Sequence, residues 1–208
     1  MKYFTFARKP NPLYDLPQNP EPAGHAAALA GAIACSSPAP EGDKKTTETV
    51  DENAKVERGR YLVGIMGCDD CHSPKVMGPM GPEPDTSRRL SGHPADMPLG
   101  PSDTNVFANG WVLMSMQLTT THGPWGKTYA ANLTSDETGI GNWSYEQFKK
   151  AMTEGKYKGM DNTRPLMPPM PWPNFRNLHE DDLQAIFAFL KSTKPVKNRV
   201  PDYAPPGS

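Results

Sequence analysis

The chain has 208 residues and a formal net charge of −1, with 22 lysines and arginines against 23 aspartates and glutamates. This balance excludes the strongly basic surface on which nucleic-acid binding depends. Hydrophobic residues make up only 36%, while there are 18 glycines and 24 prolines, so we expect a single domain with much irregular backbone. No stretch of the sequence approaches the about 20 apolar residues that a membrane-spanning helix needs.

Residues 1–52 differ in composition from the rest of the chain. A proline-rich polar start is followed by an alanine-rich run, residues 25–34, and then by Cys35. A basic start, a short apolar stretch and small residues before a cleavage point are typical of an export signal. We therefore predict that residues 1–52 are an export signal or leader followed by a flexible polar tether.

The sequence Ala32-Ile33-Ala34-Cys35 resembles a bacterial lipobox, in which Cys35 would become a lipidated N-terminus. On this interpretation the protein is periplasmic or lies on the outer face of the cytoplasmic membrane, anchored to the membrane through Cys35. The alternative is a disordered leader with an incidental thiol. The early prolines, and Ala32 at a position where leucine is usual, favour that alternative.

Residues 53–67 show the period of an amphipathic helix. The positions on one face recur at steps of three and four residues: Val56, Gly59, Leu62, Val63 and Met66. Gly59 lowers the helix propensity by about 1 kcal/mol relative to alanine, and we expect it to allow the close approach of a second helix or of a cofactor. This helix leads directly into Cys68.

Cys68-Asp69-Asp70-Cys71-His72 is the motif around which the chain is organised. The pattern Cys-x-x-Cys-His is the attachment pattern of a covalently bound c-type haem. The two thiols can form thioether bonds to one porphyrin edge, and His72 is then the proximal ligand of the iron. Since the motif occurs once, we predict one haem c, covalently bound through Cys68 and Cys71.

Two other kinds of site use a cysteine pair of this spacing. A redox-active dithiol needs a thioredoxin-like βαβ context, which the sequence does not show. Half of a zinc site needs further cysteines or histidines in a paired pattern. The remaining cysteine is Cys35, and the other histidines are scattered singly, so both interpretations lack their supporting pattern.

Residues 73–128 are rich in proline and glycine and have no sustained period. We predict a long irregular insertion, which exceeds the usual about 12–15 residues of a structureless connection, with a short strand around residues 111–118. His93 and His122 lie in this insertion and are expected to be loop residues rather than iron ligands.

Two further helices are predicted in the second half of the chain. Ser144 and Gln147 form a capping box that opens a helix ending at Gly155. The last helix spans residues 179–192, with acidic residues in its first turn and an apolar stripe formed by Leu183, Ile186, Phe187 and Leu190. We expect this last helix to cross the helix of residues 53–67, with Gly59 at the contact.

Residues 165–173 contain five prolines and two methionines. Because proline fixes φ and removes backbone donors, this segment is expected to be a rigid extended strap. An electron carrier needs a second strong iron ligand opposite His72, and methionine is a soft ligand that suits ferrous iron. The strap offers Met167 and Met170 for this role.

These motifs together resemble a class I c-type cytochrome. They are most similar to the monohaem domains of cytochrome c subunits of membrane-bound bacterial dehydrogenases, such as those for alcohols or gluconate. The matching segments are residues 59–62, 68–72, 132–134, 138–148, 155–156, 164–166, 168–172, 174–175, 182–190, 195–196 and 200–201. The resemblance implies an all-α, cytochrome c-like helical fold around one covalently bound haem. That domain would span residues 53–203, with a tail at 204–208.

The resemblance also implies roles for individual residues. In the family, a methionine followed by proline and an aromatic residue is the distal iron ligand, which indicates Met170 and leaves Met167 as the second choice. Arg164 and Trp172 are expected to bind the haem propionates from their positions in the motif. Asn132, Trp125 and Tyr129 are further candidates for the propionates from their proximity in the match.

The function implied by the resemblance is that of an electron-transfer protein and not of an enzyme. It would carry single electrons between a dehydrogenase or quinol-oxidising complex and a terminal oxidase in a bacterial respiratory chain. One alternative is a haem subunit of a stable respiratory or dehydrogenase complex. The other is a haem-based gas sensor or enzyme, in which a weakly bound methionine yields the iron to an external ligand.

Overall fold

The computed structural model describes residues 44–207, with side chains from residue 51 onward. The predicted export signal and Cys35 lie outside the described residues. In the part that is described, none of the helices combines the length and the apolar character needed to cross a membrane.

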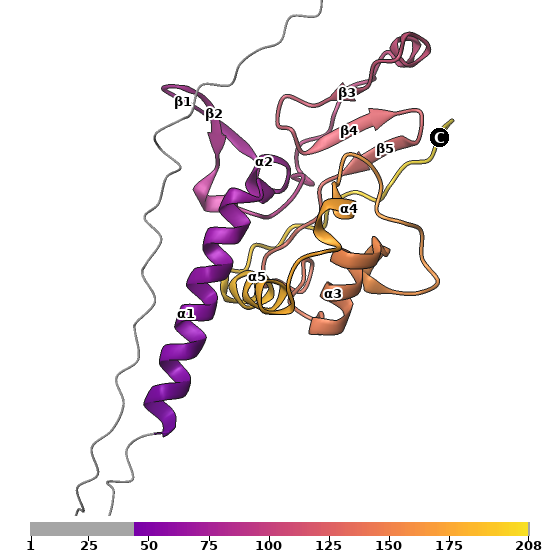
Figure 1. Cartoon of the computed structure of the whole chain (residues 1–208). Helices are drawn as coiled ribbons and strands as arrows, with labels where there is room; N and C mark the ends of the chain where they lie inside the picture. Colours follow the sequence, from indigo (N-terminus) through magenta and orange to yellow (C-terminus); the bar gives the residue numbers. More distant parts are fainter. Residues whose placement is uncertain (1–43, 208) are drawn as a thin grey trace, which may run out of the picture. The chain divides into compact units, whose positions relative to one another are not determined.

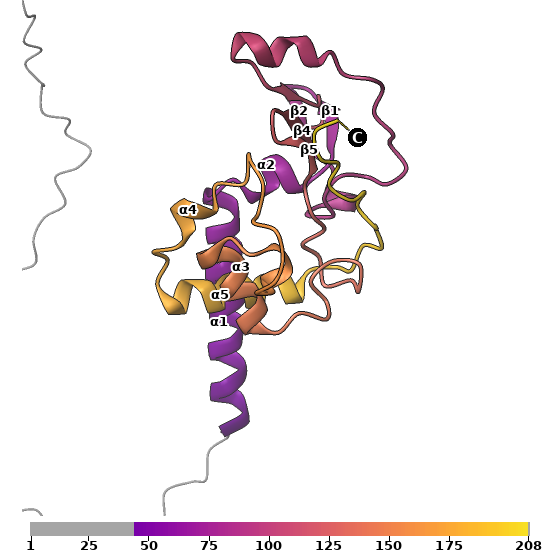
Figure 2. The same cartoon turned by 90° about the vertical axis from the view of Figure 1, so that its right-hand side faces the viewer.

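Two helices cross at the centre of the fold (Figures 1 and 2). α1 spans Lys44–Ile65 and α5 spans Glu180–Ser192, so the first predicted helix is present but begins earlier than residue 53. A Cβ atom placed on Gly59 would collide with the backbone carbonyl of Ala185 in α5. The prediction that Gly59 permits the close contact of these two helices is therefore confirmed.

The hydrophobic core gathers around this crossing. α3, Tyr145–Glu154, adds a third helix, and Ser144 and Gln147 form both hydrogen bonds of the predicted capping box. The largest buried apolar side chains come from these three helices and from two loop positions: Leu62, Val63, Leu90, Ile140, Phe148, Leu183, Ile186, Phe189 and Leu190. Leu90 and Ile140 belong to loops, and their burial in the core anchors these loops to the helices.

The prediction of an all-α fold is wrong, because two small antiparallel sheets are present. β1, Lys75–Gly78, pairs with β2, Gly81–Pro84. β4, Thr120–Gly123, lies between β3, Leu113–Met114, and β5, Gly126–Tyr129. β3 lies within the strand predicted around residues 111–118. The other strands have four residues each, too few to display the alternation that marks a strand in sequence, and tight glycine-containing turns join β1 to β2 and β4 to β5.

Buried polar contacts hold the insertion in place, so it is more ordered than its sequence indicates. The short 3₁₀ helices η1, Thr86–Arg88, and η2, Thr104–Asn109, also lie within it. His93 is almost fully buried, with Nδ1 2.9 Å from the Thr119 hydroxyl. The Asn198 side-chain amide donates to the backbone carbonyl of His93 at 2.9 Å, which joins the insertion to the C-terminal segment.

The remaining elements are single turns. They are α2, Cys68–His72, η3, Tyr157–Gly159, and α4, Trp172–Phe175. The strap is irregular up to Pro171, but its last residues form α4, because a proline is accommodated in the first turn of a helix. Near the C-terminus, Ala204 pairs with Lys127 of β5 through two backbone hydrogen bonds of 2.8 and 3.0 Å, so the predicted tail begins at a residue fixed to the sheet.

Candidate haem-binding site

The two thiols of the attachment motif lie on one side of α2. α1 ends at Ile65, and Gly67 turns the chain into α2 with a φ of 68°. Residues three apart on a helix face the same direction, so Cys68 and Cys71 are placed for attachment to a common edge. Both are free thiols and are partly buried.

The chemistry of these thiols differs from that of a redox-active pair. Burial, assisted by the charge of Asp69, raises the pKa of Cys68 to about 11. Burial and the nearby charge of Asp70 also raise the pKa of Cys71. Redox-active Cys-x-x-Cys pairs have a lowered thiol pKa instead. Among residues 51–207, there is also no group of three or more histidine, cysteine or acidic side chains arranged to hold a metal ion.

The His72 imidazole is oriented by one backbone contact. Its Nδ1 lies 2.8 Å from the carbonyl oxygen of Ala131, and because a carbonyl can only accept, Nδ1 carries the proton. Nε2 is then left with its lone pair, which is the arrangement of a histidine that ligates a metal. Burial lowers the pKa of His72, which favours this neutral form. The sequence did not reveal the role of Ala131, because a backbone carbonyl has no side-chain signature.

Met170 packs on the same hydrophobic core as Cys68. The strap that carries Met170 is attached to the second sheet, since the Thr128 hydroxyl donates to the carbonyl of Pro168 at 3.0 Å. Met167 is also partly buried, and its carbonyl accepts from the backbone N–H of Met170 at 3.3 Å. Met170 is the one of the two methionines that packs on this core among the described residues.

Trp125 has a buried indole N–H group that donates no hydrogen bond to the described residues. Within the described part of the chain, its indole Nε1 is fully buried and has no hydrogen-bond acceptor. Leaving a buried donor unpaired costs about 1–3 kcal/mol, so such a group usually meets a ligand, an ion or a water. A haem propionate is a carboxylate that would satisfy it. The residues present therefore fit a haem.

Arg164 belongs to the same region. Its guanidinium lies 3.9 Å from the ring centroid of Tyr157 and 5.0 Å from that of Tyr203. The Tyr203 hydroxyl donates to the backbone carbonyl of Trp125 at 2.6 Å. Arg164 Nη1 donates to the carbonyl of Pro165 at 3.1 Å. Among residues 51–207, Arg164 makes no ion pair with an acidic side chain, so its charge has no anionic partner there and suits a carboxylate.

The other residues predicted to bind the propionates have structural partners. The Trp172 ring packs against Gly155 and under the guanidinium of Arg176, 4.8 Å away. The Asn132 side-chain amide donates to the Val196 carbonyl at 2.8 Å. Tyr129 packs its ring on His93 with the centroids 5.1 Å apart. Trp125, which sequence reasoning ranked behind Trp172, is the tryptophan with the unpaired buried donor.

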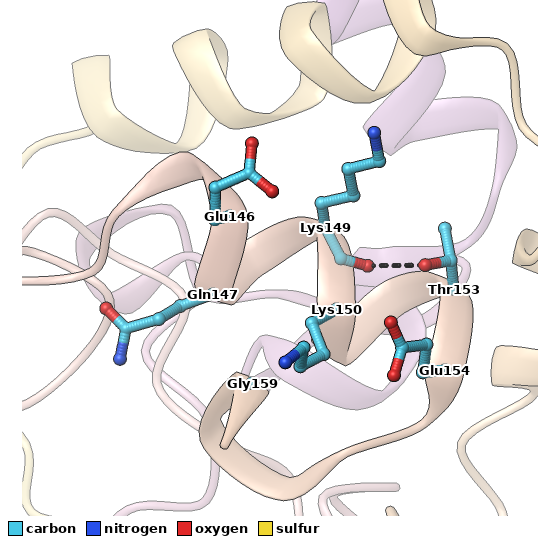
Figure 3. Close-up of a pocket in the computed structure, with 7 residues that line it drawn as sticks. All are labelled: Glu146, Gln147, Lys149, Lys150, Thr153, Glu154 and Gly159. Atoms are coloured by element: carbon cyan, nitrogen blue, oxygen red, sulfur yellow. Dashed lines mark hydrogen bonds between the residues drawn. The ribbon is translucent and has the colours of Figure 1, made fainter. Parts of the chain in front are cut away.

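A separate hollow on the surface lies along α3 (Figure 3). The side chains that line it are polar or charged and are drawn in the figure: Glu146, Gln147, Lys149, Lys150, Thr153 and Glu154, together with Gly159. Its two lysines are already paired, Lys149 with Glu180 and Lys150 with Asp161. The hollow shares no residue with the candidate haem site, and we assign it no role.

Comparisons with known proteins find cytochrome c subunits among the relatives of this chain. No protein-family model matches the chain. The chain is 30% identical over 159 residues to the cytochrome c subunit of alcohol dehydrogenase (quinone) from Gluconobacter oxydans, which covers 74% of this chain and 25% of that protein. It is 31% identical over 146 residues to the gluconate 2-dehydrogenase cytochrome c subunit of Pantoea cypripedii. This match covers 69% of this chain and 24% of that protein.

A shorter similarity, 43% over 79 residues, relates 38% of the chain to 6% of a nicotinate dehydrogenase subunit from Pseudomonas putida. The chain thus spans about a quarter of the length of the two cytochrome subunits and a smaller share of the nicotinate dehydrogenase subunit. With the Cys68–His72 turn, an oriented imidazole and these relatives, the chain resembles the c-type cytochromes. Within this class it is similar to the haem domains of the cytochrome c subunits of bacterial dehydrogenases.

Proposed function

We propose that this chain holds one haem c through thioether bonds from Cys68 and Cys71, with His72 and Met170 as the axial ligands. The observation that carries the proposal is the His72 imidazole, which is oriented through Nδ1 and leaves Nε2 free on the same turn as the two thiols. When bound, the haem supplies an iron that accepts and releases one electron at a time.

The residues of the chain contribute binding and orientation. His72 offers a neutral nitrogen whose direction is fixed by Ala131. Met170 offers a soft thioether, which favours the reduced iron and raises the potential relative to a second histidine. Trp125 and Arg164 would bind the propionates through a neutral donor and a charged donor.

The proposal is tested on protein matured together with a functional haem-attachment apparatus. The mass should increase by one haem, and the spectra of both oxidation states should show a low-spin haem c with sulfur ligation. Met170→Ala should remove the sulfur ligation and lower the potential, whereas Met167→Ala should retain both. A colourless protein with two free thiols would contradict the proposal, and an unchanged Met170→Ala variant would exclude Met170.

The proposed role is to accept electrons from a dehydrogenase and to deliver them onward to a terminal oxidase. The names of the relatives support the first partner, since these are cytochrome subunits of dehydrogenases for alcohol, gluconate and fructose. The test is reduction of the purified holo-protein by candidate dehydrogenases and its reoxidation by respiratory membranes. Failure of every dehydrogenase in the host's membranes to reduce the protein would contradict the role.

A second candidate, the haem subunit of a stable dehydrogenase complex, is favoured by an exposed apolar surface. In the described chain, most large exposed hydrophobic side chains lie on the insertion, and we call them the insertion surface: Val76, Met77, Met80, Met97, Leu99, Trp111, Val112, Met114, Met116 and Leu118. Met80 and Met116 are 94% and 87% exposed. The backbone N–H of Lys75 donates to the Gln117 side chain, which joins the two hairpins that carry much of this surface.

Exposed apolar patches of this kind mark protein interfaces, and methionine adapts well to a partner's surface. We propose a dehydrogenase subunit as the partner. Met116→Glu should abolish copurification of dehydrogenase activity with the cytochrome from native membranes. Met160→Glu, which changes an exposed methionine outside the insertion, is the matched control and should not. Equal copurification of both variants would rule out an interface at this surface.

We further propose that the protein is exported and that Cys35 is its lipidated N-terminus. The support is the sequence Ala32-Ile33-Ala34-Cys35 alone. The intact mass of the protein from native membranes tests this proposal. Cleavage before Cys35 with an added lipid mass is expected, and an unmodified chain that retains Met1 would contradict it.

A further inference from the structure

Lys75 lies just beyond α2, and its ammonium group contacts the end of that helix. Nζ donates to the carbonyl oxygens of Asp69 at 3.0 Å and Asp70 at 2.9 Å. It also donates to the carbonyl of Ser73. An ammonium has three N–H donors, so each of them is used on a backbone carbonyl of the attachment turn.

This contact matters because α2 is only five residues long. The last carbonyls of a helix lack partners within the helix, apart here from that of Asp69, which accepts the Ser73 N–H at 3.3 Å, and a single turn is not stable by itself. A cation at the C-terminal end satisfies these carbonyls and opposes the negative end of the helix dipole. The carbonyls that bind Lys75 lie on both sides of Cys71 and His72, so the lysine fixes the backbone of both residues.

The other side of the turn is held by the Asp69 carboxylate. Arg89 Nη2 lies 2.7 Å from Oδ2 of this carboxylate, and the Ser73 hydroxyl donates to its Oδ1 at 2.7 Å. The backbone N–H of Leu90 donates to that hydroxyl at 2.8 Å. Since Arg89 and Ser73 occupy the Asp69 carboxylate, the Lys75 charge remains directed at the backbone carbonyls.

We propose that Lys75 is a positioning residue for the haem: it fixes the turn that presents His72 Nε2, and its charge favours the reduced iron. This inference rests on the proposed function. An oxidised iron centre carries one more positive charge than the reduced centre. A fixed cation on the same turn therefore disfavours oxidation and raises the midpoint potential.

The test separates the position of the side chain from its charge in the holo-protein. Lys75→Met removes both the donors and the charge, Lys75→Gln keeps amide donors without the charge, and Lys75→Arg keeps the charge. Lys194→Met removes an exposed lysine that follows α5 and is the matched control. The readouts are the midpoint potential and the hydrogen exchange of the amides of residues 70–73.

We expect a lower midpoint potential in both neutral variants, faster amide exchange in Lys75→Met, and values near those of the wild type in Lys75→Arg and Lys194→Met. Neutral variants that keep the wild-type potential and exchange would overturn this inference while the wild type still binds haem. If Lys75→Met does not bind haem, the midpoint potential of Lys75→Gln, the other neutral variant, decides whether the charge of Lys75 raises the potential. A wild-type protein without haem c would overturn the proposed function itself, and this inference with it.

Discussion

Replacing Gly59 by alanine tests the helix crossing on which the fold depends. A Cβ atom at this position would overlap the backbone carbonyl of Ala185 and lie 2.7 Å from Cβ of Phe189. Backbone atoms of a packed helix cannot move aside cheaply, so we take the upper end of the overpacking range, about 3 kcal/mol. Alanine is better than glycine in a helix by about 1 kcal/mol, which leaves a net destabilisation of about 2 kcal/mol.

The control is Gly64→Ala in the same helix. A Cβ atom on Gly64 would have no neighbour within 4 Å, so only the helix propensity changes and the protein should gain about 1 kcal/mol. In a protein of 208 residues, about 2–4 °C corresponds to 1 kcal/mol. Thermal unfolding of the holo-protein should therefore show Tm falling by about 4–8 °C for Gly59→Ala and rising by about 2–4 °C for Gly64→Ala. Equal stabilisation by both substitutions would refute the close crossing of α1 and α5.

Three further predictions concern polar groups that are buried or partly buried. Burial lowers the pKa of His93 from its usual value of 6.5, so the unfolded chain binds the proton more tightly than the folded protein does. The free energy of unfolding should therefore fall as the pH drops below about 6.5. Urea unfolding at a series of pH values measures this dependence, which His93→Gln should flatten. Trp125→Phe should raise the pKa of a haem propionate and shift the pH dependence of the midpoint potential, because it removes a donor to the charged form, whereas Trp172→Phe should leave that dependence unchanged. Asp69→Asn and Arg89→Met should show a coupling of about 1 kcal/mol in a double-mutant cycle, reduced by solvent exposure of the pair, and strictly additive effects would contradict the ion pair.

The parts of the fold that the sequence predicted are those with strong local signals. The step of three and four residues around Leu62 predicted α1, and the Ser144–Gln147 pair predicted the start of α3. Gly59 predicted a close contact because a glycine on the apolar face of a helix leaves room for the backbone of a neighbouring helix. The Cys68–His72 motif indicated the candidate haem site from residue types alone, and the haem attachment itself stays a prediction.

The parts that were missed depend on contacts between distant segments. The predicted strand at residues 111–118 corresponds to β3, but β1, β2, β4 and β5 were missed, because strands of four residues show too little alternation to indicate them. Trp125 became a candidate equal to Arg164 only when the burial of its indole N–H was known. Lys75 was not singled out, because its three partners are backbone carbonyls, which every sequence contains.

The second sheet explains why an insertion with an irregular sequence belongs to the site. Within and just after β5, two residues contact the segments that carry the proposed axial ligands. The Thr128 hydroxyl donates to the carbonyl of Pro168, two residues before Met170. The Ala131 carbonyl accepts from the His72 ring. Because Thr128 and Ala131 are three residues apart, this segment links the strap that carries Met170 to the His72 ring, although the proposed ligands themselves are separated by most of the domain in sequence.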